Sequence, residues 1–256
     1  MRSLPMFDFI QDLNPWLLAL ALNSVLLALA LALPKKLLTP AGYGHAWLLG
    51  VIIWGGLGWR GYVLVMVYFL VGSAVTKIGL SQKTALGIAE KRSGQRGPEN
   101  VWGSASTAAL CALLILVVAP VWHPLLWLGY TASFSTKLAD TCASEVGKAY
   151  GQRTFLITTF KPVPRGTEGA VSLEGTLAGI IGSFIIASLA CGLGVITVWG
   201  FLWTILAAFI ATNLESVLGA TLQSRWPWLT NEVVNGINTL LGAVIAVALA
   251  WYGAIS

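Results

Sequence analysis

The chain has 256 residues, of which 57% are apolar and only 10% are charged. Soluble domains carry about 25% charged residues, so this composition excludes a soluble enzyme, a disordered chain, a fibrous repeat and a disulfide-stapled secreted module. The net charge is +5, but the charges lie between apolar segments. That placement favours membrane orientation and anionic ligands, and not nucleic acid, as the reason for the basic balance.

Hydrophobic stretches that suit a bilayer-spanning helix of about 20 residues follow one another along the chain. Eight are predicted: 16–33, 45–59, 61–76, two within 102–136 that separate at 120–124, two within 176–211 that separate near 191–194, and 233–251. The short second and third segments are expected to meet at a tight turn at Arg60, or else to form a re-entrant pair, which reduces the number to seven. The sequence therefore predicts an all-α, multi-pass transmembrane helical bundle, with one integral membrane domain over residues 1–256.

The distribution of charge predicts how these segments are oriented. With eight spans, all of the 15 Lys and Arg except Arg2 and Arg60 fall on one side, which the positive-inside rule makes the cytoplasmic side, and both termini lie opposite. Most of the ten Asp and Glu fall on that same side, which a topology signal alone does not require. The loops 77–101 and 137–171 are therefore predicted to build a site there.

The first of these loops combines bases with a few polar residues. Lys77 and Asn100 lie at predicted helix ends near the membrane surface, so a binding role is expected for both. The bases of this loop could gather phosphates or simply maintain topology, and the second interpretation is favoured for Lys83, Lys91 and Arg92.

The stretch 137–148 is predicted to continue a helix out of the membrane. At 100° per residue, one face of this helix collects two ammonium groups and two hydroxyl groups, with two carboxylates at its flanks: Lys137, Lys148, Thr141, Ser144, Asp140 and Glu145. This set suits a Mg²⁺–phosphate site in which Asp140 and Glu145 bind the metal and Lys137 and Lys148 neutralise phosphate. The alternative is a solvated helix end with i,i+3 and i,i+4 ion pairs.

A Gly/Ser/Thr-rich loop follows and opens the next helix. Lys161 and Arg165 supply positive charge, and glycines allow the backbone to approach an anion closely at a helix N-terminus. The residues expected to bind nucleotide phosphates are Gly166, Thr167, Glu168, Gly169, Ser172, Glu174 and Gly175. The loop is not a Walker A motif, and the alternative is a helix start with a capping hydroxyl and glycines for packing.

Two polar patches interrupt the C-terminal apolar segments. Glu215 and Ser216 lie at the end of one predicted helix, and Asn235 and Asn238 share a face where the last helix enters the membrane. Polar groups at membrane depth are costly and therefore indicate function. The alternative is hydrogen bonding that holds the helices together.

From about Leu70 to its end, the chain resembles the membrane family that includes animal transmembrane protein 19 and the plant and cyanobacterial phytyl-phosphate kinases. The marks are Thr76-Lys77, Glu99-Asn100, Ala139-Asp140 with Ala143-Ser144-Glu145, Gly166-Thr167-Glu168-Gly169 with Glu174-Gly175-Thr176, Glu215-Ser216, and Asn235 with Asn238-Thr239. A weaker likeness to CTP-dependent phytol and polyprenol kinases rests on the helix from Asp140 to Lys148.

The resemblance implies a kinase that converts phytyl phosphate to the diphosphate for tocopherol and phylloquinone synthesis, with a nucleoside triphosphate, CTP first, as donor and Mg²⁺ as cofactor. Asn235 and Asn238 would orient the acceptor or a metal-bound water. A kinase of free phytol or a polyprenol, and a transporter or scaffold, remain as alternatives, and oligomers are possible. The expected location is a bacterial or cyanobacterial inner or thylakoid membrane, or a plastid membrane, with the site on the cytoplasmic or stromal side.

Overall fold

The computed structural model describes residues 14–34, 36–90, 94–223 and 225–255. Four bases of the topology prediction lie outside the described residues: Arg2, Lys35, Lys91 and Arg92. The described helices are α2 (Pro15–Ala32), α3 (Pro40–Val75), α4 (Leu80–Ala85), α5 (Pro98–Leu114), α6 (His123–Tyr150), α7 (Leu173–Gly192), α8 (Val198–Leu218) and α9 (Asn231–Ile255). A 3₁₀ turn (Pro120–Trp122) precedes α6, and a π-helical turn (Gly219–Gln223) follows α8.

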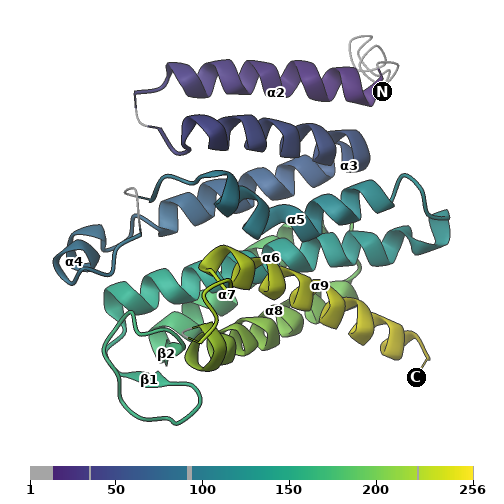
Figure 1. Ribbon diagram of the computed structural model, residues 1–256. Coiled ribbons are helices and arrows are strands. Elements are labelled where there is room, and N and C mark those ends of the chain that lie inside the picture. Colours follow the sequence, from purple (N-terminus) through teal and green to yellow (C-terminus); the bar gives the residue numbers. More distant parts are fainter. Residues whose placement is uncertain (1–13, 35, 91–93, 224, 256) are drawn as a thin grey trace.

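The predicted all-α multi-pass bundle is confirmed, and α3 contains the second and third predicted segments. The chain reverses inside α3, where Gly58 has φ 64° and ψ −162°, and Figure 1 shows the two halves side by side. The rings of Trp54 and Tyr62, one from each half, meet at 5.2 Å. The turn was expected at Arg60 but lies at Gly58, because a positive φ is open to glycine and costly for arginine.

The longest of the central helices, α6, is less apolar than its neighbours. Within the described residues, five helices are long and apolar enough to cross a membrane by length and composition: α2, α3, α7, α9 and α8 with its π-helical turn. The helix α6 packs against α3, α5, α7, α8 and α9, and its residues 128–139 are all buried. Because other helices surround it, α6 needs no lipid-facing apolar surface and can carry polar side chains into the bundle.

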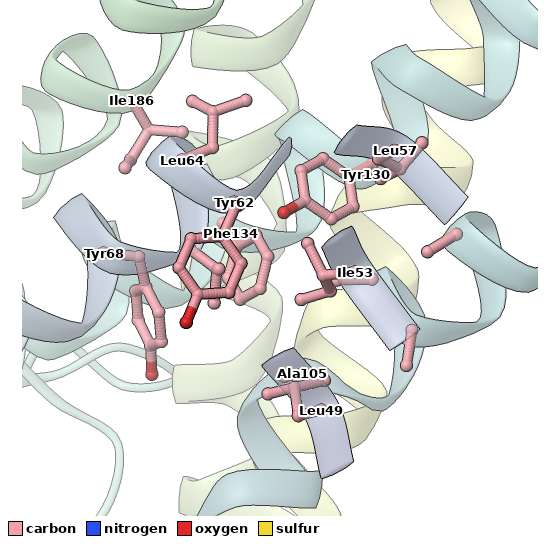
Figure 2. Close-up of a cluster of buried hydrophobic side chains, with 14 of the residues drawn as sticks. Leu49, Ile53, Leu57, Tyr62, Leu64, Tyr68, Ala105, Tyr130, Phe134 and Ile186 are labelled. Carbon is pink, nitrogen blue, oxygen red and sulfur yellow. The ribbon is translucent and has the colours of Figure 1, made fainter. Parts of the chain in front are cut away.

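Aromatic and aliphatic side chains form the core between α3 and α6 (Figure 2). The ring of Tyr68 stacks on that of Phe134 at 5.0 Å, and Tyr130 meets the edge of Phe134 at 5.2 Å. The buried hydroxyl of Tyr130 donates a hydrogen bond of 2.6 Å to the carbonyl oxygen of Gly61. These contacts fix the depth of α6 relative to the α3 hairpin.

Small residues bring α7 directly onto α6. A Cβ at Gly175 would lie 2.6 Å from the carbonyl oxygen of Ala143, and a Cβ at Gly182 would lie 3.0 Å from that of Leu138. Close backbone approach of this kind is typical of helix packing in membranes. The spacing of these glycines therefore places the start of α7 beside the polar half of α6.

A short β-hairpin, which the sequence analysis did not predict, connects α6 to α7. The strands β1 (Thr154–Leu156) and β2 (Ala170–Ser172) pair antiparallel. In Figure 1 this hairpin and α4 lie at one end of the bundle, whereas the start of α2 and the end of α9 lie at the other.

This arrangement predicts the outcome of a labelling experiment. In a chain whose three cysteines (Cys111, Cys142 and Cys191) are replaced by alanine, a cysteine at Arg153, beside β1, should react with a membrane-impermeant thiol reagent from the cytoplasmic side only. A cysteine at Val121, which is exposed in the turn before α6, should react from the opposite side only. Labelling of both positions from one side would contradict the predicted topology.

Candidate active site

A polar cavity of about 710 Å³ lies between the helices at the end of the bundle that carries the β-hairpin. Its walls come from α5, α6, α7, α8 and α9 and from the chain around residues 166–171. Most of the residues that the sequence singled out line this cavity, although they are spread over more than 100 positions of the chain. The fold therefore gathers the separate motifs into one site.

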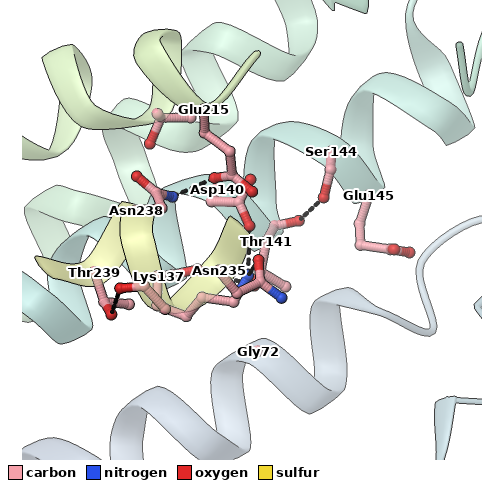
Figure 3. A network of polar contacts seen from close by, with 12 residues as sticks. Gly72, Lys137, Asp140, Thr141, Ser144, Glu145, Glu215, Asn235, Asn238 and Thr239 are labelled. Carbon is pink, nitrogen blue, oxygen red and sulfur yellow. Dashed lines mark hydrogen bonds and ion pairs between the residues drawn. The ribbon is translucent and has the colours of Figure 1, made fainter. Parts of the chain in front are cut away.

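The centre of the site is a group of five side chains that we call the polar cluster: Lys137, Asp140, Glu215, Asn235 and Asn238 (Figure 3). Lys137 Nζ donates to Asp140 Oδ2 at 2.5 Å and to Asn235 Oδ1 at 2.6 Å. The carboxyl groups of Asp140 and Glu215 face each other and interact. Asn238 Nδ2 donates to Glu215 Oε2. Three helices, α6, α8 and α9, thus hold two carboxyl groups against one lysine.

One acceptor atom of the polar cluster is left without a partner. Asn238 is fully buried, and its Oδ1 has no hydrogen-bond partner among the described residues. An unpartnered buried acceptor costs about 1–3 kcal/mol, so a bound cation or a donor group of a ligand would relieve it. The cluster therefore holds one amide oxygen whose hydrogen-bonding capacity is unused among the described residues.

The structure does not pair Asp140 with Glu145, as the metal-site prediction required. Glu145 is 2% exposed and forms an ion pair with Lys83, which is fully buried, while Lys148 Nζ lies 4.0 Å from Glu145 Oε1. Residues five positions apart in a helix lie about 140° apart around its axis, and Glu215, from another helix, faces Asp140 in its place. Lys83, which the sequence analysis assigned to topology, is therefore also a member of a buried ion pair.

The remaining predicted residues of α6 line the cavity beside the cluster. Thr141 Oγ1 donates to the carbonyl oxygen of Lys137, and Ser144 Oγ donates to that of Thr141. Lys148 is half-buried at the outer rim. The helical face that the sequence predicted is therefore directed into the cavity. Both hydroxyl groups, however, donate their hydrogen bonds to backbone carbonyl oxygens of α6.

The loop before α7 also reaches the cavity, where Gly166, Thr167, Glu168, Gly169, Ser172 and Gly175 all contribute to the lining. Ser172 is the N-cap of α7, because its Oγ accepts from the backbone N–H of Gly175 at 3.1 Å. Ser172 thus caps α7 and Gly175 allows α7 to pack closely on α6, which are the structural roles that the alternative interpretation of this loop expected.

Gly169 provides a prediction about stability. Its φ is 75°, and a Cβ there would lie 2.5 Å from the carbonyl oxygen of Ser216 and 2.5 Å from the Cβ of Ala220. Gly194 has a similar φ of 68° but open space around it. Gly169→Ala should therefore lower the free energy of unfolding by about 1–3 kcal/mol more than Gly194→Ala, measured by thermal or SDS-induced unfolding in detergent micelles. Equal losses of unfolding free energy in the two variants would show that the close contact of Gly169 with α8 does not contribute to stability.

Five predicted binding residues do not line the cavity. Asn238 is one of them, since it is fully buried where it donates to Glu215. Lys77 and Lys161 are exposed. Arg165 Nη1 donates at 3.1 Å to the carbonyl oxygen of Ala149, where it satisfies the C-terminus of α6. Glu174 Oε1 accepts from the backbone N–H of Gln152 at 3.3 Å. Arg165 and Glu174 therefore support the connection between α6 and α7, whereas Glu168, in the same loop, lines the cavity.

The opposite wall contains Asn100, which was predicted, and Arg96, which was not. Asn100 accepts from the N–H of Gly97 at 2.9 Å and donates to Glu232 Oε1 at 3.3 Å. Arg96 lines the cavity, donates to the hydroxyl of Tyr68 at 3.0 Å and lies over its ring. The only sequence signal for Arg96 is its position just before the helix that begins with Pro98, next to the Glu99-Asn100 motif.

Over the part of the chain that the structure describes, no group of three or more His, Cys, Asp or Glu side chains is arranged to hold a metal ion. A metal at this site would have to share its coordination with a ligand. Mg²⁺ commonly does so, since it binds through one or two carboxylates together with substrate phosphates.

Comparison with known proteins gives consistent matches. Residues 23–243 match the family model described as integral membrane protein DUF92. The membrane protein sll0875 of Synechocystis sp. is 70% identical over 235 residues, which cover 92% of this chain and 91% of the relative. Protein VTE6, chloroplastic, of Arabidopsis thaliana is 46% identical over 245 residues (94% and 74%), and the membrane protein MJ0933 of Methanocaldococcus jannaschii is 31% identical over 229 residues (88% and 91%). No solved structure matches the chain.

Proposed function

We propose, because the chain belongs to the DUF92 family of integral membrane proteins, that the polar cavity is the active site of a kinase acting on an isoprenoid monophosphate. The acceptor is phytyl phosphate and the product is phytyl diphosphate. The donor is a nucleoside triphosphate, and CTP is the first candidate. Support comes from the motifs shared with phytyl-phosphate kinases and from the 46% identity to the chloroplastic relative. The product would serve tocopherol and phylloquinone synthesis in a cyanobacterial or plastid membrane.

The observation that carries the proposal is the polar cluster at one end of a membrane bundle. Two carboxyl groups and a buried lysine converge from the packed helices α6 and α8, inside a cavity of about 710 Å³. A cavity of this size falls within the usual range for small-molecule sites, about 300–1,000 Å³. A phosphorylated isoprenoid matches this setting, since its chain dissolves in the bilayer and its phosphate stays at the polar end.

The donor atoms of the cluster fit Mg²⁺. Asp140 and Glu215 would bind the ion, and the amide oxygen of Asn238, which lacks a partner among the described residues, lies beside Glu215. Carboxylate and amide oxygens are the protein ligands of hard cations. When bound, Mg²⁺ would neutralise charge on the phosphates of the donor. Glu145, assigned to this role from the sequence, is replaced by Glu215.

Positive groups on the walls would hold the phosphates of the two substrates. Lys137 lies in the polar cluster, Lys148 lies at the rim, and Arg96 lies on the opposite wall. The backbone of the loop 166–169 borders the exposed mouth of the cavity, where a nucleotide would enter from water. Asn235, which accepts from Lys137, fixes the direction of that ammonium group.

The proposed reaction transfers the γ-phosphoryl group of the nucleotide to a phosphate oxygen of the acceptor. A P–O bond forms to that oxygen, the bond from the γ-phosphorus to the β–γ bridging oxygen breaks, and the nucleoside diphosphate leaves. The acceptor oxygen is already anionic at pH 7, because the second pKa of a phosphate monoester is about 6. No strong general base is needed, and the protein has to neutralise charge and align the two anions.

The test is to incubate the purified protein in detergent with phytyl phosphate, Mg²⁺ and each of CTP, ATP, GTP and UTP, and to measure phytyl diphosphate. We expect turnover, fastest with CTP. Phytol serves as a second acceptor, and phosphorylation of phytol but not of phytyl phosphate would replace the proposal by a kinase of the free alcohol. Absence of turnover with every nucleotide, from protein that is folded and monodisperse, would favour a transporter or scaffold.

A further inference from the structure

Residues that line the cavity are exposed at two places of opposite character, which we take as its two openings. At the hairpin end, the lining residues that are exposed are polar, among them Thr167, Glu168 and Asn231. Between α7 and α8, two large apolar residues that line the cavity are also exposed on the outside of the bundle: Ile180 is 39% exposed and Phe209 is 43% exposed. The cavity therefore reaches both the aqueous end and the lateral surface of the bundle.

The lateral opening faces the surface that lipid would cover. Around it, α7 and α8 present exposed apolar side chains, including Leu177, Phe184 and Leu202. On the α9 side, by contrast, the apolar lining residues Leu229 and Val234 are buried, so the wall is closed there. The seam between α7 and α8 is thus where the cavity meets an apolar exterior.

Polarity falls along this seam with depth. On α8, Glu215 of the polar cluster is followed inward by Thr212 and then by Phe209, six residues away from Glu215. At 1.5 Å per residue the apolar opening lies about 9 Å deeper than the carboxyl groups. Farther along the seam, the rings of Phe184 and Phe201 meet at 5.5 Å across α7 and α8.

We propose, on the basis of the proposed function, that the seam between α7 and α8 holds the isoprenoid chain of the acceptor, which enters laterally from the bilayer between Ile180 and Phe209. The phosphate then lies at the polar cluster and the chain leaves the cavity about 9 Å deeper. The nucleotide uses the polar opening. A single acyclic chain is the occupant, because the seam joins a phosphate-sized polar pocket directly to an apolar surface.

The first test compares two tryptophan variants one residue apart on α7. Ile180→Trp, which narrows the seam, should raise the KM for phytyl phosphate at least tenfold. It should leave the KM for CTP, and the KM for a short acceptor such as dimethylallyl phosphate, within twofold of the original protein. The matched control is Ile181→Trp, since Ile181 is 61% exposed and does not line the cavity. Equal effects of the two variants would overturn the proposal.

A second variant guards against misfolding of the first. Phe209→Ala removes apolar contact and adds no bulk, and it should raise the KM for phytyl phosphate about threefold to tenfold. Leu206→Ala, at another exposed position of α8 outside the cavity, is its control and should have no effect. No difference between these two alanine variants would also count against the seam.

A binding experiment separates this inference from the proposed reaction. Phytyl phosphate with a diazirine in its first isoprene units should label α7 and α8, and Ile180→Trp should suppress the labelling. If phytyl phosphate labels the seam but is not converted to product, the inference about the seam stands and the proposed kinase activity is rejected. If product forms but labelling is confined to α5 or α9, the proposed kinase activity stands and the inference about the seam is rejected.

Discussion

Asp140→Asn should lower kcat at least about 100-fold while leaving the fold intact. Asp140 accepts from Lys137 at 2.5 Å and faces Glu215, so the change removes one of the two carboxylates that would hold Mg²⁺. Loss of such charge neutralisation costs several kcal/mol in the transition state, and each 1.36 kcal/mol is a factor of ten in rate. The measurement is the initial rate of phytyl diphosphate formation at saturating Mg²⁺ and both substrates.

The control for this variant is Glu174→Gln. Glu174 is also an acidic residue of the shared motifs, but it lies outside the cavity and accepts a backbone N–H. It should keep at least half of the original rate. Size-exclusion profiles of the two variants should match that of the original protein. A near-normal rate for Asp140→Asn would exclude Asp140 from the metal and phosphate site.

Lys83→Met should destabilise the protein by about 3–5 kcal/mol. The change removes one member of a buried ion pair. Among the described residues, the carboxylate of Glu145, which is 2% exposed, then keeps only Lys148 at 4.0 Å as an ion-pair partner. An unpaired buried charge of this kind is strongly destabilising. Lys83 Nζ also donates to the carbonyl oxygen of Thr76 at 2.8 Å, and that bond is lost as well. SDS-induced unfolding of the purified protein measures the effect.

A double variant distinguishes loss of the pair from general disruption. Lys83→Met combined with Glu145→Gln should recover much of the lost stability, because no unpaired charge remains buried. Lys161→Met, at an exposed lysine outside the cavity, should change stability by less than about 0.5 kcal/mol. If Lys83→Met were as stable as Lys161→Met, α4 would not be held on α6 by this ion pair.

The sequence alone was sufficient for the fold class and the family. Apolar segments separated by Pro, Gly and charged residues predict the helices closely, because bilayer thickness sets the length of a span. The reversal inside α3 was predicted two residues too late, at Arg60 and not at Gly58. The resemblance to the transmembrane protein 19 and phytyl-phosphate kinase family is confirmed by the match over residues 23–243.

The sequence also identified the polar face of α6, since residues such as Lys137, Ser144 and Lys148 recur at the helical period and this signal is local. Asp140, on the flank of that face, was found for the same reason. The helical periodicity could not predict which side chain each of these residues contacts. The pairing of Asp140 with Glu145 was inferred from neighbours on one helix, whereas in the structure Asp140 faces Glu215 from another helix.

Only the tertiary structure decided which charges are buried together. From the sequence Lys83 was assigned to topology, yet it is fully buried against Glu145, 62 positions away in the chain. Asn238 reaches Glu215 across 23 positions, and Arg96 enters the cavity by stacking on Tyr68. Such contacts depend on how helices pack against each other, and packing brings together residues whose separation in the sequence carries no periodic signal. The sequence therefore identified most of the side chains of the site, and the packing of α6 against α4, α8 and α9 determined how they are paired.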